Sequence, residues 1–318
     1  MIIGLQESAK LDDFNRDQKA VTIHLIGALA VRKSSTPLLP KECIFCGAWE
    51  NLTGEHVFAE WLAPYLPKIG RTGHTATKTL RVLDASSLKV IRDTHFARKG
   101  TLHKRGPLKN QTLKIVCARC NTGWMSMLQG QVKPILLPIL EGGWPGEIAA
   151  WERRILAAWA AMFTMVVEFS DLDTQVTPFE DRERLRLTLE PPDGWYIWIG
   201  LHAGPLWTSG FNHFAWPSIP KVYSKGQIDK AYKNDVQSTG WLVGPAFFQT
   251  ISAGVPGYPV DRFAFAIRHG LRVVWPSDKL PIERPVRVMD DIAADNVTVG
   301  HLPHFYPRKT LRKAWETM

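Results

Sequence analysis

The four cysteines constrain this chain more than any other feature. They form two C-x2-C pairs, Cys43 with Cys46 and Cys117 with Cys120, and no cysteine is left over. A C-x2-C turn brings two thiolates to one ion, and two such turns supply the four sulfur ligands of a tetrahedral structural zinc site. We therefore predict one structural Zn²⁺ on these four residues. The alternatives are redox dithiols and unconnected buried thiols, but neither pair lies in a thioredoxin-like context.

The two pairs lie much farther apart than the knuckles of a simple zinc ribbon. Residues 47–116 separate them, whereas a ribbon has about 15–20 residues between its pairs. We therefore expect an insertion between the two halves of the metal site. Residues 68–114 are rich in Lys, Arg, Thr and Gly, which predicts extended loops or an exposed hairpin in this insertion.

The positive charge of the chain is concentrated in the same region. The formal net charge is +9, and residues 41–130 hold 14 basic and six acidic residues, whereas residues 131–318 hold 20 of each. A local basic excess is typical of a surface that binds a polyanion. Because the excess adjoins a predicted metal site, we favour a nucleic-acid partner over a merely solvated surface.

The chain divides into a lead-in at 1–40 without an assigned role, a cysteine-containing domain at 41–130 and a C-terminal domain at 131–318. We expect short helices over 57–65 and from 122 onward, and apolar positions at helical spacing predict a long helix over 151–169. Apolar runs predict strands over 185–189, 195–201, 241–251, 262–267 and 271–275. The predicted fold class is α+β, with a zinc-stapled domain followed by an α+β domain that has a long helix and antiparallel strands.

Membrane insertion is not expected. No apolar run reaches the roughly 20 residues that cross a bilayer, and the apolar stretch at 21–31 follows acidic residues, unlike a signal peptide. We expect a cytoplasmic protein.

Three further residues surround the cysteine pairs. Glu55-His56 lies between the pairs, and Asn121 directly follows the last cysteine. This combination resembles the HNH (ββα-metal) endonuclease family. The similarity is sharper to a subgroup with C-x-x-C-G, then E-H-V followed by W-L, then C-x-x-C-N-x-G-W-M. It covers about residues 41–130, and the matching segments are Cys46-Gly47, Glu55-His56-Val57, Trp61-Leu62 and Cys120-Asn121-Thr122-Gly123-Trp124-Met125.

The resemblance implies a catalytic site made of His56, Glu55 and Asn121. His56 is then the general base that takes a proton from the attacking water, since a histidine exchanges protons near neutral pH. Glu55 and Asn121 are then the oxygen ligands of one Mg²⁺ or Mn²⁺ ion. The zinc holds the scaffold and takes no part in the chemistry.

The chain departs from the family pattern at two positions. The family often has an Asn between the histidine and the second cysteine pair, and Thr112 stands there in this chain, beside Asn110 and Gln111. Which residue orients His56 is therefore left open. Ala59 also stands where the family often has Pro, which we interpret as a local backbone difference.

The resemblance and the charge together predict DNA as the partner. Phosphate contacts position a nucleic acid without reading its sequence, and the candidate residues for them are Arg71, Lys78, Arg81, Arg98, Lys99, Lys104, Arg105 and Lys109. Two alternatives to a nuclease are a non-catalytic zinc-stapled nucleic-acid-binding module and a structural zinc protein. The C-terminal domain could form a homodimer or bind another protein.

Overall fold

The computed structural model describes residues 20–26, 40–49, 51–67, 75–84, 90–99, 107–205, 209–216, 222–223, 234–254, 258, 260–276, 282–285 and 287–298. Over these ranges the chain is a mixed α+β structure, as predicted. None of the helices in these ranges is long and apolar enough to cross a bilayer.

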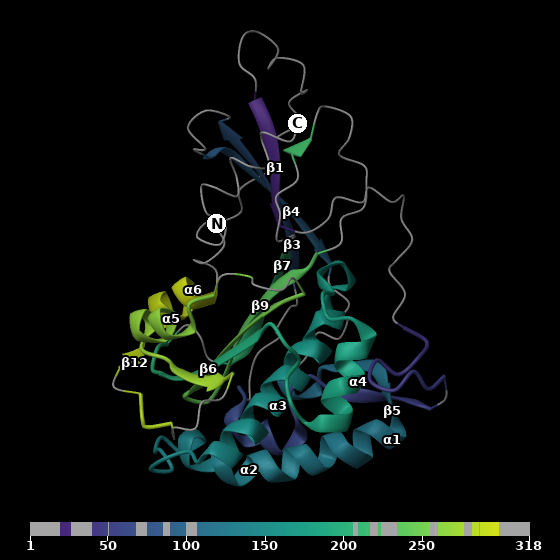
Figure 1. Cartoon of the computed structure of the whole chain (residues 1–318), viewed down its shortest axis with the longest axis vertical. Helices are drawn as coiled ribbons and strands as arrows, with labels where there is room; N and C mark the ends of the chain where they lie inside the picture. The colour runs from purple at the N-terminus through teal and green to yellow at the C-terminus, as the bar shows by residue number, and fades with distance from the viewer. Residues whose placement is uncertain are drawn as a thin grey trace.

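An antiparallel sheet forms the centre of the C-terminal half. Its strand order is β11-β6-β10-β9-β7, and β12 joins β6 in parallel. The bounds are β6 Trp195–His202, β7 Gly210–Trp216, β9 Val236–Val243, β10 Ala246–Ala253, β11 Arg272–Trp275 and β12 Val288–Met289. Every residue of β9 and β10 is buried, because helices cover both faces of the sheet (Figure 1).

The described residues contain six α-helices. Their bounds are α1 Ala118–Cys120, α2 Ser126–Leu140, α3 Ala150–Val167, α4 Phe179–Thr188, α5 Arg262–His269 and α6 Asp291–Thr298. Side chains alternate across β9, so Trp241 packs into the core with α3 while Leu242 packs into the core with α5 and α6. The short 3-10 helices are η2 Glu60–Tyr65, η3 Leu108–Asn110, η5 Glu168–Ser170 and η6 Leu172–Thr174.

Helix α3 is the shared wall between the two halves of the molecule. Its Phe163 ring stacks on Trp241 of the sheet at 4.2 Å between centroids and lies 5.2 Å from Phe58 of the cysteine-containing domain. Trp159, one turn earlier, meets Trp241 edge-on at 5.0 Å. Aromatic pairs at these distances add to the free energy of burial. One continuous hydrophobic core therefore runs across residue 130.

The cysteine-containing domain is built on a two-stranded antiparallel ladder of β2, Leu52–His56, and β5, Thr112–Cys117. The chain passes directly from β5 into α1, then through the segment Asn121–Met125, which is kinked at the non-helical Gly123, into α2. The expected short helix after His56 is present as η2, and the expected helix after Asn121 is present as α2.

A second sheet combines three distant parts of the sequence. Its order is β4-β3-β1-β8, with β1 Ala20–Ile26, β3 Thr75–Asp84, β4 Val90–Lys99 and β8 Val222–Tyr223. The hairpin predicted in the insertion is confirmed as β3–β4, which pair from Thr75↔Lys99 to Leu83↔Val90. In Figure 1 this sheet lies above the large one. The boundaries at residues 40 and 130 stay a prediction.

Two of the predicted strands are wrong. Residues 185–189 belong to the end of α4, where Leu185 is buried, Leu187 is exposed and Leu189 takes the left-handed conformation that ends the helix. Residues 262–267 form α5, because the Asp261 side chain accepts hydrogen bonds from two backbone N–H groups of its first turn. Such a cap stabilises a helix start. The predicted strand at 241–251 is in fact the hairpin of β9 and β10.

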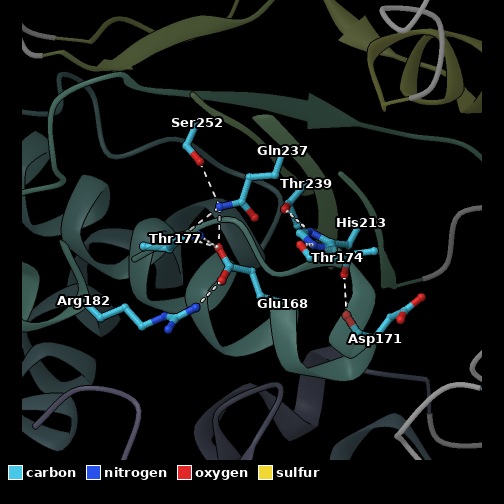
Figure 2. Close-up of polar contacts among 9 residues, drawn as sticks. All are labelled: Glu168, Asp171, Thr174, Thr177, Arg182, His213, Gln237, Thr239 and Ser252. Carbon is cyan, nitrogen blue, oxygen red and sulfur yellow. Dashed lines mark hydrogen bonds and ion pairs between the residues drawn. The ribbon is translucent and has the colours of Figure 1, made fainter. Parts of the chain in front are cut away.

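A buried polar cluster fixes the end of α3 to α4 and to the sheet. The Glu168 carboxylate is fully buried and accepts hydrogen bonds from Arg182 at 2.6 Å, from Thr177 and from Gln237. Gln237 also donates to Ser252 of β10 at 2.9 Å. Figure 2 shows that donors from three elements converge on this one carboxylate. A buried charge needs such partners to offset the loss of water.

His213 of β7 lies beside this cluster (Figure 2). Its Nε2–H group donates to the Thr174 carbonyl at 3.2 Å, so Nδ1 accepts from the Thr239 hydroxyl at 2.8 Å. Desolvation keeps the pKa of His213 below its ordinary value. The imidazole is therefore a neutral bridge between the 171–178 segment and the sheet.

Arg182→Met leaves the Glu168 carboxylate buried without its cation. We expect this variant to lose about 3–5 kcal/mol of unfolding free energy in urea titrations. The control is Arg184→Met on the same helix, which removes an exposed 3.5 Å contact with Asp193 and should cost less than about 1 kcal/mol. Similar losses in the two variants would contradict the role given to the buried pair.

Candidate metal centre and active site

The structure brings the four predicted cysteines together. The Sγ atoms of Cys43, Cys46, Cys117 and Cys120 all lie within 4.8 Å of one another, and those of Cys46 and Cys117 are 3.6 Å apart. Four thiolates at about 2.3 Å around a tetrahedral zinc ion are roughly 3.8 Å apart. The donor set and its dimensions therefore fit a structural Zn²⁺ ion.

Local turns place each pair of thiols. The first pair lies on a tight turn in which the Gly47 N–H group donates to the Cys43 carbonyl at 2.9 Å, and Gly47 has a φ of +69°. This left-handed conformation favours glycine. The second pair spans the step from β5 into α1, where the Cys120 N–H group donates to Cys117 Sγ at 3.4 Å. Both geometries are typical of zinc knuckles.

The β2–β5 ladder explains the long gap between the pairs. Leu52 pairs with Cys117, and the Ile44 N–H group donates to the Ile115 carbonyl at 3.0 Å, which holds the first turn against the second. At the other end, the Val57 N–H group donates to the Gln111 carbonyl at 2.9 Å. The insertion therefore leaves the ladder after Val57 and returns to it at the neighbouring Gln111. Its length does not change the positions of the cysteines.

Without a bound cation, burial and mutual repulsion disfavour the ionisation of several of these thiols at once. Burial raises the pKa of Cys43, and burial together with the charge of Cys43 raises the pKa of Cys120. Burial also acts to raise the pKa of Cys46, but hydrogen bonds from the Ala48 backbone and the other thiols outweigh it and lower that pKa to about 7. The exposed Arg119 guanidinium interacts with Cys46 and compensates part of the negative charge.

Helix α4 of the C-terminal half supports the first knuckle. Its Arg186 donates through Nε to the Phe45 carbonyl, between the two cysteines, at 3.2 Å. The Phe45 ring in turn meets Trp124 edge-on at 5.0 Å. The cluster around Glu168 thus anchors the same helix that holds the metal centre.

We expect the purified protein to contain one zinc per chain by elemental analysis. Cys117→Ser should lose the metal and destabilise the protein by at least several kcal/mol, because the binding energy of a structural zinc is largely folding energy. The measurements are the zinc content and the thermal midpoint of both proteins. A variant that keeps one zinc per chain would exclude Cys117 as a ligand.

Glu55 and His56 occupy successive positions at the end of β2 and differ in exposure. Glu55 pairs with Leu113 and is 8% exposed, whereas His56 pairs with Thr112 and its side chain is 30% exposed. Successive residues of a strand face opposite sides. The buried carboxylate and the accessible imidazole are therefore able to serve separate tasks.

A backbone carbonyl orients His56. The imidazole Nδ1–H group donates to the Lys109 carbonyl at 2.9 Å, and Nε2 lies 3.2 Å from a carboxylate oxygen of Glu60. Because the carbonyl occupies Nδ1, Nε2 is the nitrogen through which His56 can exchange a proton. The sequence left open which residue orients His56. In the structure this residue is Lys109 of η3, which acts through its backbone carbonyl, so no side chain at Thr112 is needed.

Asn121 is fixed by a hydrogen bond to the strand that carries Glu55. Its Nδ2–H group donates to the Thr53 hydroxyl at 3.0 Å, and that hydroxyl donates to the Val116 carbonyl at 3.1 Å. In the part of the chain that the structure describes, its Oδ1 atom has no hydrogen-bond partner. Thr53 is therefore a supporting residue that sequence reasoning missed.

Glu55 lies in an apolar environment that favours its neutral form. Burial, together with the charge of Glu60, raises the pKa of Glu55 to about 7. No hydrogen bond or ion pair to the Glu55 carboxylate occurs among the described residues. Perturbed carboxylates without a structural partner are typical of functional sites. The same residues hold no group of three Cys, His, Asp or Glu ligands besides the four cysteines, so Glu55, His56 and Glu60 do not form a three-ligand metal cluster.

Glu55→Gln should change how stability depends on pH. The raised pKa means that between about pH 4.5 and 7 the folded protein keeps a proton that the unfolded chain has lost, so stability falls as the pH rises. Gln carries no charge at any pH. The stability advantage of Glu55→Gln over wild type should therefore grow by about 2 kcal/mol from pH 5 to pH 8 in urea titrations.

The matched control for this experiment is Glu147→Gln, which removes a carboxylate from the exposed surface. Its difference from wild type should be the same at both pH values. A Glu55→Gln advantage that does not change with pH would mean that the Glu55 carboxylate is not held away from water.

The predicted phosphate-binding residues fall on the insertion as follows. Lys78 and Arg81 lie on β3, and Arg98 and Lys99 lie on β4. Lys109 is exposed on η3 beside His56. The remaining candidates, Arg71, Lys104 and Arg105, lie outside the described residues.

Comparisons with family models, with curated proteins and with solved structures found no match.

Proposed function

We propose that this chain is a metal-dependent endonuclease of the HNH type that hydrolyses phosphodiester bonds in DNA. The observation that carries the proposal is the orientation of His56. A hydrogen bond to the Lys109 carbonyl holds the ring through Nδ1, and Nε2 faces the exposed Glu60 carboxylate at 3.2 Å, which a water molecule can replace. This is the arrangement that a general base needs.

The order of elements supports the same proposal. Two antiparallel strands, β2 and β5, lead into α1 and α2, and the cysteine cluster ties the start of β2 to the start of the helix. Glu55 lies on the first strand and Asn121 at the start of the helical segment. This strand–strand–helix order with a metal centre is what the resemblance to the ββα-metal family implies.

Each residue has a role in hydrolysis. His56 accepts a proton from water at Nε2 once the exposed Glu60 carboxylate, 3.2 Å away, has turned aside to admit the water, and Glu60 then pairs with the resulting imidazolium. The Glu55 carboxylate and the Asn121 Oδ1 atom are the proposed ligands of Mg²⁺ or Mn²⁺, since both are hard oxygen donors. A bound cation there would stabilise the charge that develops on the phosphate. Lys109 and the basic insertion bind the DNA backbone.

A plasmid-nicking assay tests the proposal. The wild-type protein should cleave supercoiled DNA in the presence of Mn²⁺ or Mg²⁺, and His56→Ala should lower the rate by at least about a hundredfold, because general-base catalysis contributes roughly 10²–10⁴. The zinc content and thermal midpoint of the variant should match those of wild type, since His56 is not a zinc ligand.

Two results would contradict the proposal. Cleavage by His56→Ala at the wild-type rate would remove His56 from the mechanism. A wild-type protein that binds DNA and zinc but never cleaves would favour the non-catalytic zinc-stapled binding module.

A further inference from the structure

A small pocket separates the end of β2 from helix α3. Glu55 and His56 line it from the strand, and Trp159 and Phe163 line it from α3. Gln129 of α2 is the third polar side chain in its lining, and the rest of the lining is apolar or aromatic. The proposed catalytic residues therefore share this pocket with one amide side chain to which the sequence assigned no role.

Two tryptophans fix the orientation of that amide. The indole N–H groups of Trp61 and Trp159 both donate to Gln129 Oε1, each at 2.9 Å. An indole nitrogen can only donate, so the atom between the two rings must be the amide oxygen. The Nε2 atom with its two N–H donors is consequently directed elsewhere, and the described residues offer it no acceptor.

The tryptophan on α3 is itself held rigidly. Trp159 is almost fully buried, and its ring meets Trp241 at 5.0 Å and Phe248 at 5.6 Å, both edge-on. Its ring centroid is 6.4 Å from that of Trp61. Gln129 is thus fixed from the core of the C-terminal half, and its amide cannot turn over without leaving both indoles unpaired.

The pocket therefore contains a donor without an acceptor and an acceptor without a donor. Within the described ranges, Gln129 Nε2 and the Glu55 carboxylate both lack a partner, and the two residues line the same small pocket. We propose that Gln129 is a positioning residue for Glu55. Its Nε2–H group donates through one bridging water to one carboxylate oxygen and leaves the other oxygen for the divalent cation.

This inference rests on the proposed function, and it gives the C-terminal half a part in the site. Helix α3 supplies Trp159, which orients the Gln129 amide. In this inference the same amide positions the Glu55 carboxylate. Residues that support a metal ligand in this way typically change metal affinity by about 10–100-fold when they are lost. The C-terminal half would then complete the active site.

Direct Mn²⁺ binding to the zinc-loaded, full-length protein, followed by electron paramagnetic resonance, tests the role of Gln129. Gln129→Met and Trp61→Phe both remove the hydrogen bond between these two residues, but only Gln129→Met removes the amide donor. We expect the Kd for Mn²⁺ to rise roughly tenfold or more in Gln129→Met and to stay within about threefold in Trp61→Phe, whose amide is still held by Trp159. Equal effects of the two substitutions would overturn the inference.

A second readout needs neither a divalent cation nor cleavage. The side-chain amide ¹H–¹⁵N resonances of Gln129 should move in Glu55→Ala and stay in place in Glu60→Ala, which removes the other nearby carboxylate. A merely structural amide that only bridges the two indoles would not respond to Glu55→Ala, and that result would overturn the inference.

The two readouts also separate this inference from the proposed function. If the wild-type protein binds no Mn²⁺ and cleaves no DNA, the proposed function fails, and the Gln129 resonances alone decide whether the amide positions Glu55. If Mn²⁺ binds and His56→Ala stops cleavage while Gln129→Met binds Mn²⁺ as tightly as wild type, the function stands and the positioning role is wrong.

Discussion

The antiparallel pairing of β2 with β5 is the interaction on which the metal centre and the candidate active site both depend. It sets Leu52 opposite Cys117, which brings the two C-x2-C turns within reach of one ion. The same ladder carries Glu55 and His56 at its far end and leads into the helical segment that begins with Asn121. Because register along a strand is fixed in steps of one residue, a slip would exchange the buried and exposed positions of Glu55 and His56.

Helix α3 has the corresponding role between the two halves of the chain. Its apolar surface is shared, with Phe58 of the cysteine-containing domain on one side and Trp241 of the large sheet on the other. The Glu168 cluster then ties the end of α3 to α4, and Arg186 of α4 donates to the carbonyl of Phe45 in the first cysteine turn. Packed side chains and a few hydrogen bonds in this way connect the large sheet to the cysteine cluster.

The sequence predicted those features that are encoded in local patterns. The C-x2-C pairs gave the cysteine cluster, and the helical spacing of apolar residues gave α3. The apolar runs at 185–189 and 262–267 led to wrong strand predictions, because the caps at Leu189 and Asp261 make these segments part of helices α4 and α5. The partner of His56 could not be predicted, because it is the backbone carbonyl of Lys109, and any residue type offers the same atom. The contact of Gln129 with Trp61 and Trp159 depends on tertiary packing that no local pattern encodes.

The hydrogen bond from Val57 to the Gln111 carbonyl closes the insertion at its base. A segment whose two ends are held together can change in length at little energetic cost, because each doubling of a flexible loop costs only about 0.6 kcal/mol. The β3–β4 hairpin can therefore change in length without disturbing the residues at this base, whereas its pairing with β1 restricts what can replace β3. In this architecture the hairpin and the strand ends at its base are free to diverge in length at different rates.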